Sequence, residues 1–236
     1  MNTNSNSYTL IYATVMVVIV ALMLAFVSGA LKDTQNANVK LDKKKQILMS
    51  LQIDFEGQNA DELFDKYVID GLVLNSKAEV LIQSRDKAFD VDVVKELSKK
   101  LEDRQLPVYV ASVEGKTKYV IPLRGAGLWG AIWGYLALDE DKNTVYGSYF
   151  THASETPGLG ANIADEPFQK QFKGKHILNE KANFVSVAVV KPGKMAEGQE
   201  QVDGIAGGTI TSKGVEKMLF DCLSQYDEFY KKGGVK

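Results

Sequence analysis

The run YTLIYATVMVVIVALMLAFVSGAL, residues 8–31, decides how this chain is organised, because it carries no charge and is mostly aliphatic. At about 1.5 Å per residue in a helix, such a run crosses the roughly 30 Å hydrocarbon layer of a membrane with some tilt. Tyr8 and Tyr12 suit an interface, where amphipathic rings prefer to lie. We therefore predict a membrane-spanning helix at 8–31, preceded by a short tail at 1–7.

A cleaved signal peptide is the alternative interpretation of the same run. Ser28, Gly29 and Ala30 are small enough for a cleavage site. Against cleavage, the apolar run is longer than the hydrophobic part of a signal peptide, and no Lys or Arg precedes it. Length and flanking charge therefore favour an uncleaved anchor.

The charges on the two sides of the predicted span bear on its orientation. The segment before the span has no Lys or Arg, whereas the segment after it carries Lys32, Lys40, Lys43, Lys44 and Lys45. Short segments rich in Lys and Arg tend to stay in the cytoplasm. Taken alone, this bias predicts that the large domain is cytoplasmic.

The composition of the chain excludes several classes of function. The net charge is −2 and no basic stripe with interleaved aromatic residues appears, so we expect no nucleic-acid partner. The one cysteine, Cys222, cannot form a disulfide within the chain or supply a site with several thiolates. The two histidines, His152 and His176, lack metal-ligand spacing, which argues against a metalloenzyme.

The region after the predicted span mixes helical and β patterns. Apolar residues at helical spacing predict helices at 32–53, 59–67, 91–103 and about 212–231, and a short helix at 165–173 with Asp165 as N-cap. Extended apolar runs predict strands at 79–83, 107–113, 118–123, 132–138, 145–151 and 184–190. We therefore predict a connecting helix at 32–57 and, at 58–236, an α+β domain with an antiparallel sheet and flanking helices.

Three glycine-bearing segments contain the candidate ligand-binding residues. They are GAGLWG at 125–130, HASETPGLG at 152–160 and DGIAGGTITS at 203–212. In the third segment, glycines allow backbone N–H groups to approach a ligand closely, and hydroxyls stand just before a helix, which favours phosphate. The alternative is a plain glycine turn in which Thr211 or Ser212 caps the last helix.

The first two segments are weaker signals when each is taken alone. In the second, Pro157-Gly158 predicts a turn and Gly160 permits a close backbone approach. Glu155 is a candidate general base, although such carboxylates are usually structural or solvated. In the first segment, Leu128 and Trp129 suit the face of a flat ring, but by default such residues belong to the core.

The ordered set of these motifs behind an apolar helix resembles the FMN-binding domain family. G-x-G-L-W-G, H-x-x-E-T-P-G-L-G and D-G-x-A-G-G-T-x-T-S follow one another ahead of a C-terminal helix. Over nearly the whole chain the pattern is similar to the C subunits of sodium-translocating NADH:quinone reductases. The related alternative is the G subunit of Rnf-type ferredoxin:NAD electron-transport complexes, which overall length and the long helical stretch after the anchor disfavour.

The resemblance implies one covalent FMN per chain. In the family, a flavin transferase joins the FMN phosphate to the last threonine of the motif Asp-x-x-Ser/Ala-Gly-Ala-Thr, which here starts at Asp203 and ends at Thr209. This sequence departs from the motif with Gly208 in place of the usual alanine and Ala206 where serine is common. Thr211 is the rival acceptor, and the register favours Thr209.

The resemblance also implies contacts between this chain and the flavin. They fall into three groups: Gly207, Gly208, Thr211 and Ser212 around the phosphate; Glu155, Thr156, Gly158, Leu159 and Gly160 at the ribityl chain or ring edge; and Leu128 and Trp129 beside the ring. No catalytic residue is implied, because the cofactor itself carries the electrons and the protein supplies position and electrostatics.

The setting implied by the family conflicts with the lysine bias. The resemblance places the flavin domain on the periplasmic side of a bacterial inner membrane, with other membrane subunits passing electrons from NADH toward quinone while sodium is exported. We expect the periplasmic side, because partner subunits can set topology and many of the lysines lie far from the span, where the bias weakens. A membrane-anchored ligand-binding or sensory domain without redox activity and a purely structural assembly subunit are the remaining alternatives.

Overall fold

The computed structural model describes residues 5–232, and it divides the chain into two compact units, Met1–Lys43 and Lys44–Lys236. Residues 1–4 of the predicted tail and residues 233–236 of the predicted domain lie outside the described residues. From Asn6 on, the first unit is helical, and the second unit holds the β-sheet.

One continuous helix, α1 (Asn6–Ser50), contains both the predicted span and most of the predicted connecting helix. It is long and apolar enough to cross a membrane, and the side chains of its apolar run are exposed. The helix stops at Ser50, earlier than the sequence predicts, because Gln52 adopts a left-handed backbone with φ 57°. The bonds from Gln52 N to Met49 O (2.9 Å) and from Ile53 N to Leu48 O (3.0 Å) complete a Schellman ending.

A six-stranded antiparallel sheet organises the second unit and confirms the predicted α+β class. Its order is β2-β1-β3-β4-β5-β6. The bounds are β1 Val68–Leu74, β2 Val80–Gln83, β3 Leu106–Val113, β4 Lys116–Ala126, β5 Ala131–Leu138 and β6 Val145–His152. The strand β1 is an addition to the predicted strands.

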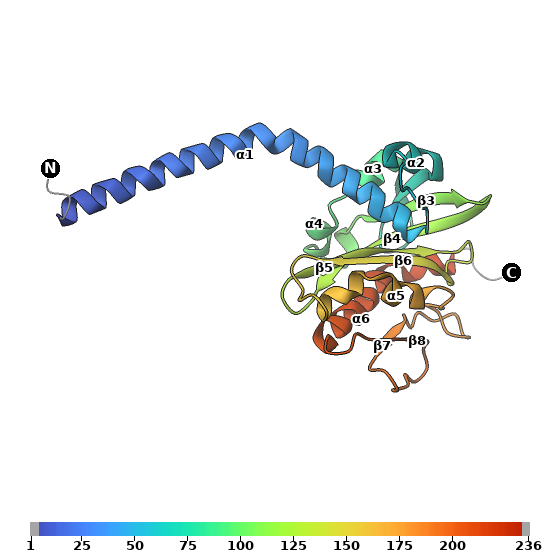
Figure 1. The fold of residues 1–236 in the computed structure, drawn as a ribbon. Helices are drawn as coiled ribbons and strands as arrows, with labels where there is room; N and C mark the ends of the chain where they lie inside the picture. Colours follow the sequence, from blue (N-terminus) through green and yellow to red (C-terminus); the bar gives the residue numbers. More distant parts are fainter. Residues whose placement is uncertain (1–4, 233–236) are drawn as a thin grey trace. The chain divides into compact units, whose positions relative to one another are not determined.

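Helices cover both faces of this sheet (Figure 1). On one face, α6 (Thr209–Leu223) lies against β4 and shares its core with Val108, Ile121 and Leu136. On the other face, α2 (Ala60–Tyr67) and α3 (Arg85–Asp90) pack through Phe64, Phe89 and Tyr109. Alternate strand residues therefore enter different cores.

Two of the predicted helices are broken into short pieces. The region predicted as a helix at 91–103 holds only α4 (Val93–Leu97) and η1 (Leu101–Asp103). The helix is interrupted because the Arg104 guanidinium donates hydrogen bonds to the carbonyls of Leu97 and Lys99, at 2.9 Å each. At 165–173 the structure has α5 (Glu166–Gln169) and η3 (Lys170–Phe172), following η2 (Gly160–Ala164). Asp165 occupies the N-cap position of α5, but its side chain makes no capping bond.

The C-terminal half departs from the predictions in two further places. The run predicted as a strand at 184–190 is interrupted at Ser186, whose φ is 64°. It makes an isolated bridge from Phe184 to Leu178 and a strand only at β7 (Ala188–Val190), which pairs in parallel with β8 (Gln201–Asp203). The last helix starts at Thr209, three residues before the predicted start, and continues through η4 (Ser224–Tyr226) into α7 (Asp227–Lys231).

The last turns of α1 belong to the core of the second unit. Ile47, Leu48 and Leu51 are fully buried. Gln46 Oε1 accepts a hydrogen bond from Trp133 Nε1 on β5 at 3.2 Å, and Lys44 pairs with Asp61 on α2 at 2.7 Å. The end of α1 is thus rigidly packed into the domain that it leads into.

This packing predicts different costs for two neighbouring truncations. Leu48→Ala should destabilise the full-length protein by about 2–5 kcal/mol, because it removes methyl groups from a filled core. Met49→Ala, at a side chain that is 39% exposed, should cost much less. Thermal or denaturant unfolding in detergent measures both, and equal small losses would show that the end of α1 is not packed as described.

Candidate functional site

The three glycine-bearing segments occupy connections that the fold brings together. The first forms the β4–β5 turn, in which Gly127 N donates to Gly130 O at 2.8 Å. The second follows β6 and leads into η2, and the third links β8 to α6. Because α6 lies across β4, the start of α6 comes close to the β4–β5 turn.

Cys222 is part of the attachment of α6 to β4. Its Sγ accepts a hydrogen bond from Arg124 N and donates one to Arg124 O, both at 3.3 Å. Burial raises the pKa of this thiol to about 11. Cys222 therefore holds the helix to the strand as a neutral thiol.

A buried carboxylate, Glu155, joins the three segments. Its side chain is 5% exposed. Oε1 accepts a hydrogen bond from Trp129 N in the first segment at 2.8 Å, and Oε2 accepts one from Thr211 Oγ1 in the third at 2.6 Å. The backbone of Glu155 is also fixed, because its N–H donates to Nδ1 of His152 at 3.1 Å.

The space for this carboxylate depends on two glycines. A Cβ atom on Gly127 would collide with Glu155 Oε1, and one on Gly160 would collide with both Glu155 Oε2 and Thr211 Oγ1. A side chain at either position would therefore displace the Glu155–Thr211 bond. Close approach is the reason why these two motif positions hold glycine.

The hydroxyls of Thr211 and Ser212 make tertiary and turn contacts and do not cap α6. The N-cap residue is Gly208, and it makes no side-chain cap bond. Thr211, 1% exposed, bonds Glu155, and Ser212 Oγ accepts from Ile205 N at 2.9 Å. The alternative of a plain capped turn is therefore wrong, because both hydroxyls lie inside the first turn and hold neighbouring segments.

Thr209 differs sharply from Thr211. It is the first residue of α6 and is exposed. Within residues 5–232, its hydroxyl makes no hydrogen bond. The N-terminus of this 15-residue helix carries unpaired N–H groups and a partial positive charge. Thr209 is thus an accessible hydroxyl at a place that favours an anion.

Asp203, six residues earlier, marks the end of β8. Its backbone is held by the Gln171 side-chain amide, which accepts from Asp203 N at 2.8 Å and donates to Asp203 O at 3.2 Å. Its carboxylate is exposed. The structure therefore fixes where the turn toward Thr209 starts.

Apolar side chains stand exposed beside these segments. Leu128 is 47% exposed, Trp129 66% and Leu159 42%. The default expectation that Leu128 and Trp129 are core residues is wrong, because the β4–β5 turn lifts them out of the sheet. Leu159 lies over Gly207, whose missing Cβ would be 2.6 Å from Leu159 Cδ2.

Ile210, 60% exposed, is a neighbour of Thr209 that the sequence motifs do not single out. Its only sequence signal is an apolar residue between two threonines at a helix start. Together these four residues, Leu128, Trp129, Leu159 and Ile210, are here called the apolar rim. Exposed apolar side chains within glycine-rich polar segments are typical of a binding surface.

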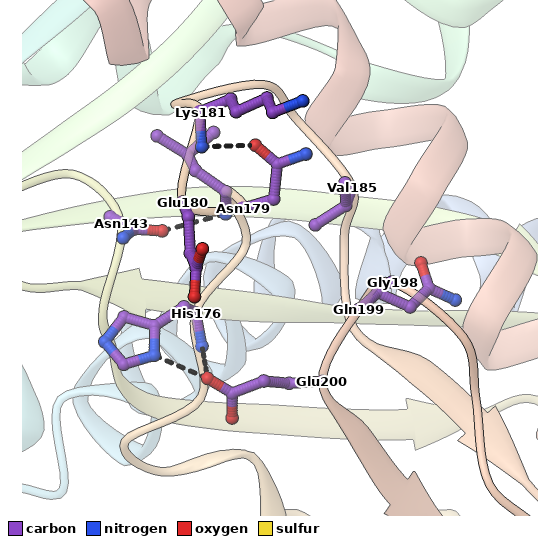
Figure 2. A pocket seen from close by; sticks show the side chains of 10 residues that line it. Asn143, His176, Asn179, Glu180, Lys181, Val185, Gly198, Gln199 and Glu200 are labelled. Carbon is purple, nitrogen blue, oxygen red and sulfur yellow. Dashed lines mark hydrogen bonds and ion pairs between the residues drawn. The ribbon is translucent and has the colours of Figure 1, made fainter.

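An open cleft of about 670 Å³ lies elsewhere (Figure 2). Its lining includes His176 and Glu200, which meet at 2.5 Å, together with Asn143, Asn179 and Lys181. None of the candidate residues of the three segments lines it. Residues 5–232 also hold no group of three or more side chains suited to a metal ion. The glycine segments therefore remain the candidate site.

Comparison with known proteins agrees with this location. The model of the FMN-binding domain family matches residues 127–224, a range that spans all of these segments except the first two residues of the first. The chain is 34% identical to the C subunit of the Na(+)-translocating NADH-quinone reductase of Haemophilus ducreyi, covering 91% of this chain and 88% of that one. It is 31% identical to the corresponding C subunit of Pseudomonas aeruginosa, covering 97% and 96%.

A solved structure shows the same fold. The crystal structure of the C subunit of the Na(+)-translocating NADH-quinone reductase from Parabacteroides distasonis matches with a TM-score of 0.78 and 46% identity, over 85% of this chain and 96% of that one. Since relatives above 30% identity match over most of their length, the chain belongs to the family of Na(+)-translocating NADH-quinone reductase C subunits, which are parts of an oxidoreductase complex.

Proposed function

We propose that this chain is a membrane-anchored flavoprotein subunit that carries one FMN as a phosphoester on Thr209 and relays electrons from NADH toward quinone. The contrast between two threonines carries the proposal. Thr209 is exposed and has no partner within the described residues, whereas the rival Thr211 is buried and bonded to Glu155. Only the first offers its hydroxyl to an incoming phosphate.

The residues around Thr209 fit the phosphate of FMN. The α6 N-terminus supplies N–H groups and a favourable dipole, and the glycine turn at 204–208 lets the backbone approach the anion. We place Gly207 and Gly208 at the phosphate. Thr211 and Ser212 support this turn from beneath.

The attachment is a phosphoryl transfer onto the threonine. Thr209 Oγ1 forms a bond to the FMN phosphorus, the bond from phosphorus to its leaving group breaks, and the hydroxyl proton is released. Relative to threonine and free FMN, one water is lost. A partner flavin transferase must supply the flavin with an activated phosphate, because hydroxide is a poor leaving group.

The apolar rim suits the remainder of the flavin. Leu128, Trp129 and Leu159 offer apolar contact to a flat ring, and the exposed turn residues Thr156 and Gly158 lie beside them in the chain. When bound, FMN supplies the redox chemistry, and the protein supplies its position and surroundings. The covalent bond prevents the flavin from diffusing away.

We place the flavin domain on the periplasmic side of a bacterial inner membrane, in contact with other subunits of a sodium-exporting complex. The relatives are named as subunits of a Na(+)-translocating NADH-quinone reductase, which supports the sodium-translocating complex. One of the opposing lysines also has another use, since Lys44 pairs with Asp61 in the folded domain.

The phosphoester predicts a specific mass change. Full-length protein produced with its flavin transferase should gain the mass of one FMN less one water and should fluoresce after denaturation. Thr209→Val, which removes the hydroxyl at nearly constant volume, should abolish both signals. Thr209→Ser keeps an acceptor hydroxyl and should retain flavin. Unmodified wild-type protein under these conditions would rule out the attachment.

The proposed orientation predicts where a protease can act. Lys194 precedes Met195, which is 84% exposed in the loop between β7 and β8. Trypsin added to intact spheroplasts should cut this loop while a cytoplasmic marker protein stays whole. Cleavage that occurs only after lysis would place the domain in the cytoplasm.

A further inference from the structure

We infer that Glu155 is a positioning residue that clamps the first turn of α6 to the β4–β5 turn and so presents Thr209 to the flavin transferase. The inference rests on the proposed attachment at Thr209. It differs from the role implied by the family resemblance, in which Glu155 touches the ribityl chain or ring. In the structure, protein groups occupy both of its carboxylate oxygens.

The clamp bridges segments that are far apart in the sequence. Trp129 and Glu155 are 26 positions apart, and Glu155 and Thr211 are 56 apart. Thr211 lies two residues after Thr209, on the same first turn of α6. Holding Thr211 therefore fixes the rotation and height of the turn that carries the acceptor hydroxyl.

Its ionised state makes this carboxylate a strong acceptor for its partners. Hydrogen bonds that an ionised carboxylate accepts from N–H and O–H donors are about twice as strong as hydrogen bonds between neutral groups. Burial alone raises the pKa of Glu155, but the bonds from the Thr211 hydroxyl and from the Trp129 and Leu128 N–H groups outweigh it, so the pKa lies below its ordinary value. The clamp is therefore ionised at neutral pH.

The site is shaped to keep this carboxylate away from a ligand. Gly127 and Gly160 leave just enough room for its two oxygens, and the side chain is 5% exposed. A phosphate on Thr209 carries negative charge, so a carboxylate that was free to turn toward it would repel it. Tying both oxygens to protein donors lessens that repulsion, because the dipoles of the donors oppose the charge of the carboxylate.

Preorganisation is the expected benefit of the clamp. A transferase must bring the hydroxyl of Thr209 in line with an activated phosphate, and a fixed acceptor avoids the entropy cost of ordering the turn during the reaction. Trp129 and Leu128 of the apolar rim are set by the same carboxylate. One residue thus fixes both the attachment point and one side of the ring surface.

Two substitutions at Thr211 separate the clamp from general stability. Thr211→Val keeps the shape but deletes the donor, and Thr211→Ser keeps the donor. With full-length protein, purified transferase and its flavin donor, Thr211→Val should slow FMN incorporation at Thr209 about tenfold or more, the size expected for one charge-assisted hydrogen bond. Thr211→Ser should stay close to wild type.

Hydrogen exchange gives a readout that needs no flavin. In the unmodified full-length protein, the amide of Trp129 and the first turn of α6 should exchange faster in Thr211→Val than in wild type or Thr211→Ser. Glu155→Gln, which keeps the volume but loses the charge, should show the same two changes. In the Glu155→Gln/Thr211→Val double variant, the combined effect should be smaller than the product of the two single effects, because both substitutions weaken the Glu155–Thr211 bond.

The outcomes distinguish this inference from the proposed function. Wild-type protein that takes up no FMN would contradict the attachment itself. Wild-type protein that is modified normally, with Thr211→Val and Glu155→Gln modified at the same rate and with unchanged exchange, would overturn the clamp alone. If either variant fails to fold, the other provides the same comparison against Thr211→Ser.

Discussion

A buried ion, the carboxylate of Glu155, is the constraint on which the arrangement of this site depends. Burying a carboxylate is costly unless donors satisfy it. Here one donor lies in the β4–β5 turn and the other in the first turn of α6. Gly127 and Gly160 leave room for this carboxylate, because a Cβ atom at either position would collide with one of its oxygens. Polar burial, which usually weakens a small domain, is used here to hold three loops in one place.

The consequence is a division of labour between two threonines that stand two positions apart. Thr211 faces inward and holds the turn, and Thr209 opens the helix and is exposed. A helix advances about 100° per residue, so residues two apart face nearly opposite directions. The same geometry leaves Ile210 on the surface, where it extends the apolar rim. One helical turn therefore carries both the threonine that holds it in place, Thr211, and the proposed acceptor, Thr209.

Much of this architecture was predictable from sequence, and the failures have physical causes. The uncharged apolar run at 8–31 predicted the long helix because of its length, and the extended apolar runs between turn signals predicted most strands of the antiparallel sheet. The prediction of one helix at 91–103 was wrong, because the Arg104 guanidinium donates hydrogen bonds to two carbonyls of this segment. Arg104 lies after the apolar pattern on which the prediction was based. At the site, the order of the three glycine-bearing motifs correctly identified the segments that the fold brings together. The role of Glu155 and the exposure of Leu128 and Trp129 depend on contacts between segments, which no local pattern reports.

The central claim, that the exposed threonine and not the clamped one carries the flavin, can be tested at single-residue resolution. Trypsin should release the peptide 195–213, which contains Thr209, Thr211 and Ser212 and no internal Lys or Arg. Tandem mass spectrometry that preserves the phosphoester should place the FMN on fragments that contain Thr209, and leave the fragments of 210–213 unmodified. An adduct on Thr211 or Ser212, or a peptide without any adduct from protein matured with its transferase, would contradict the account.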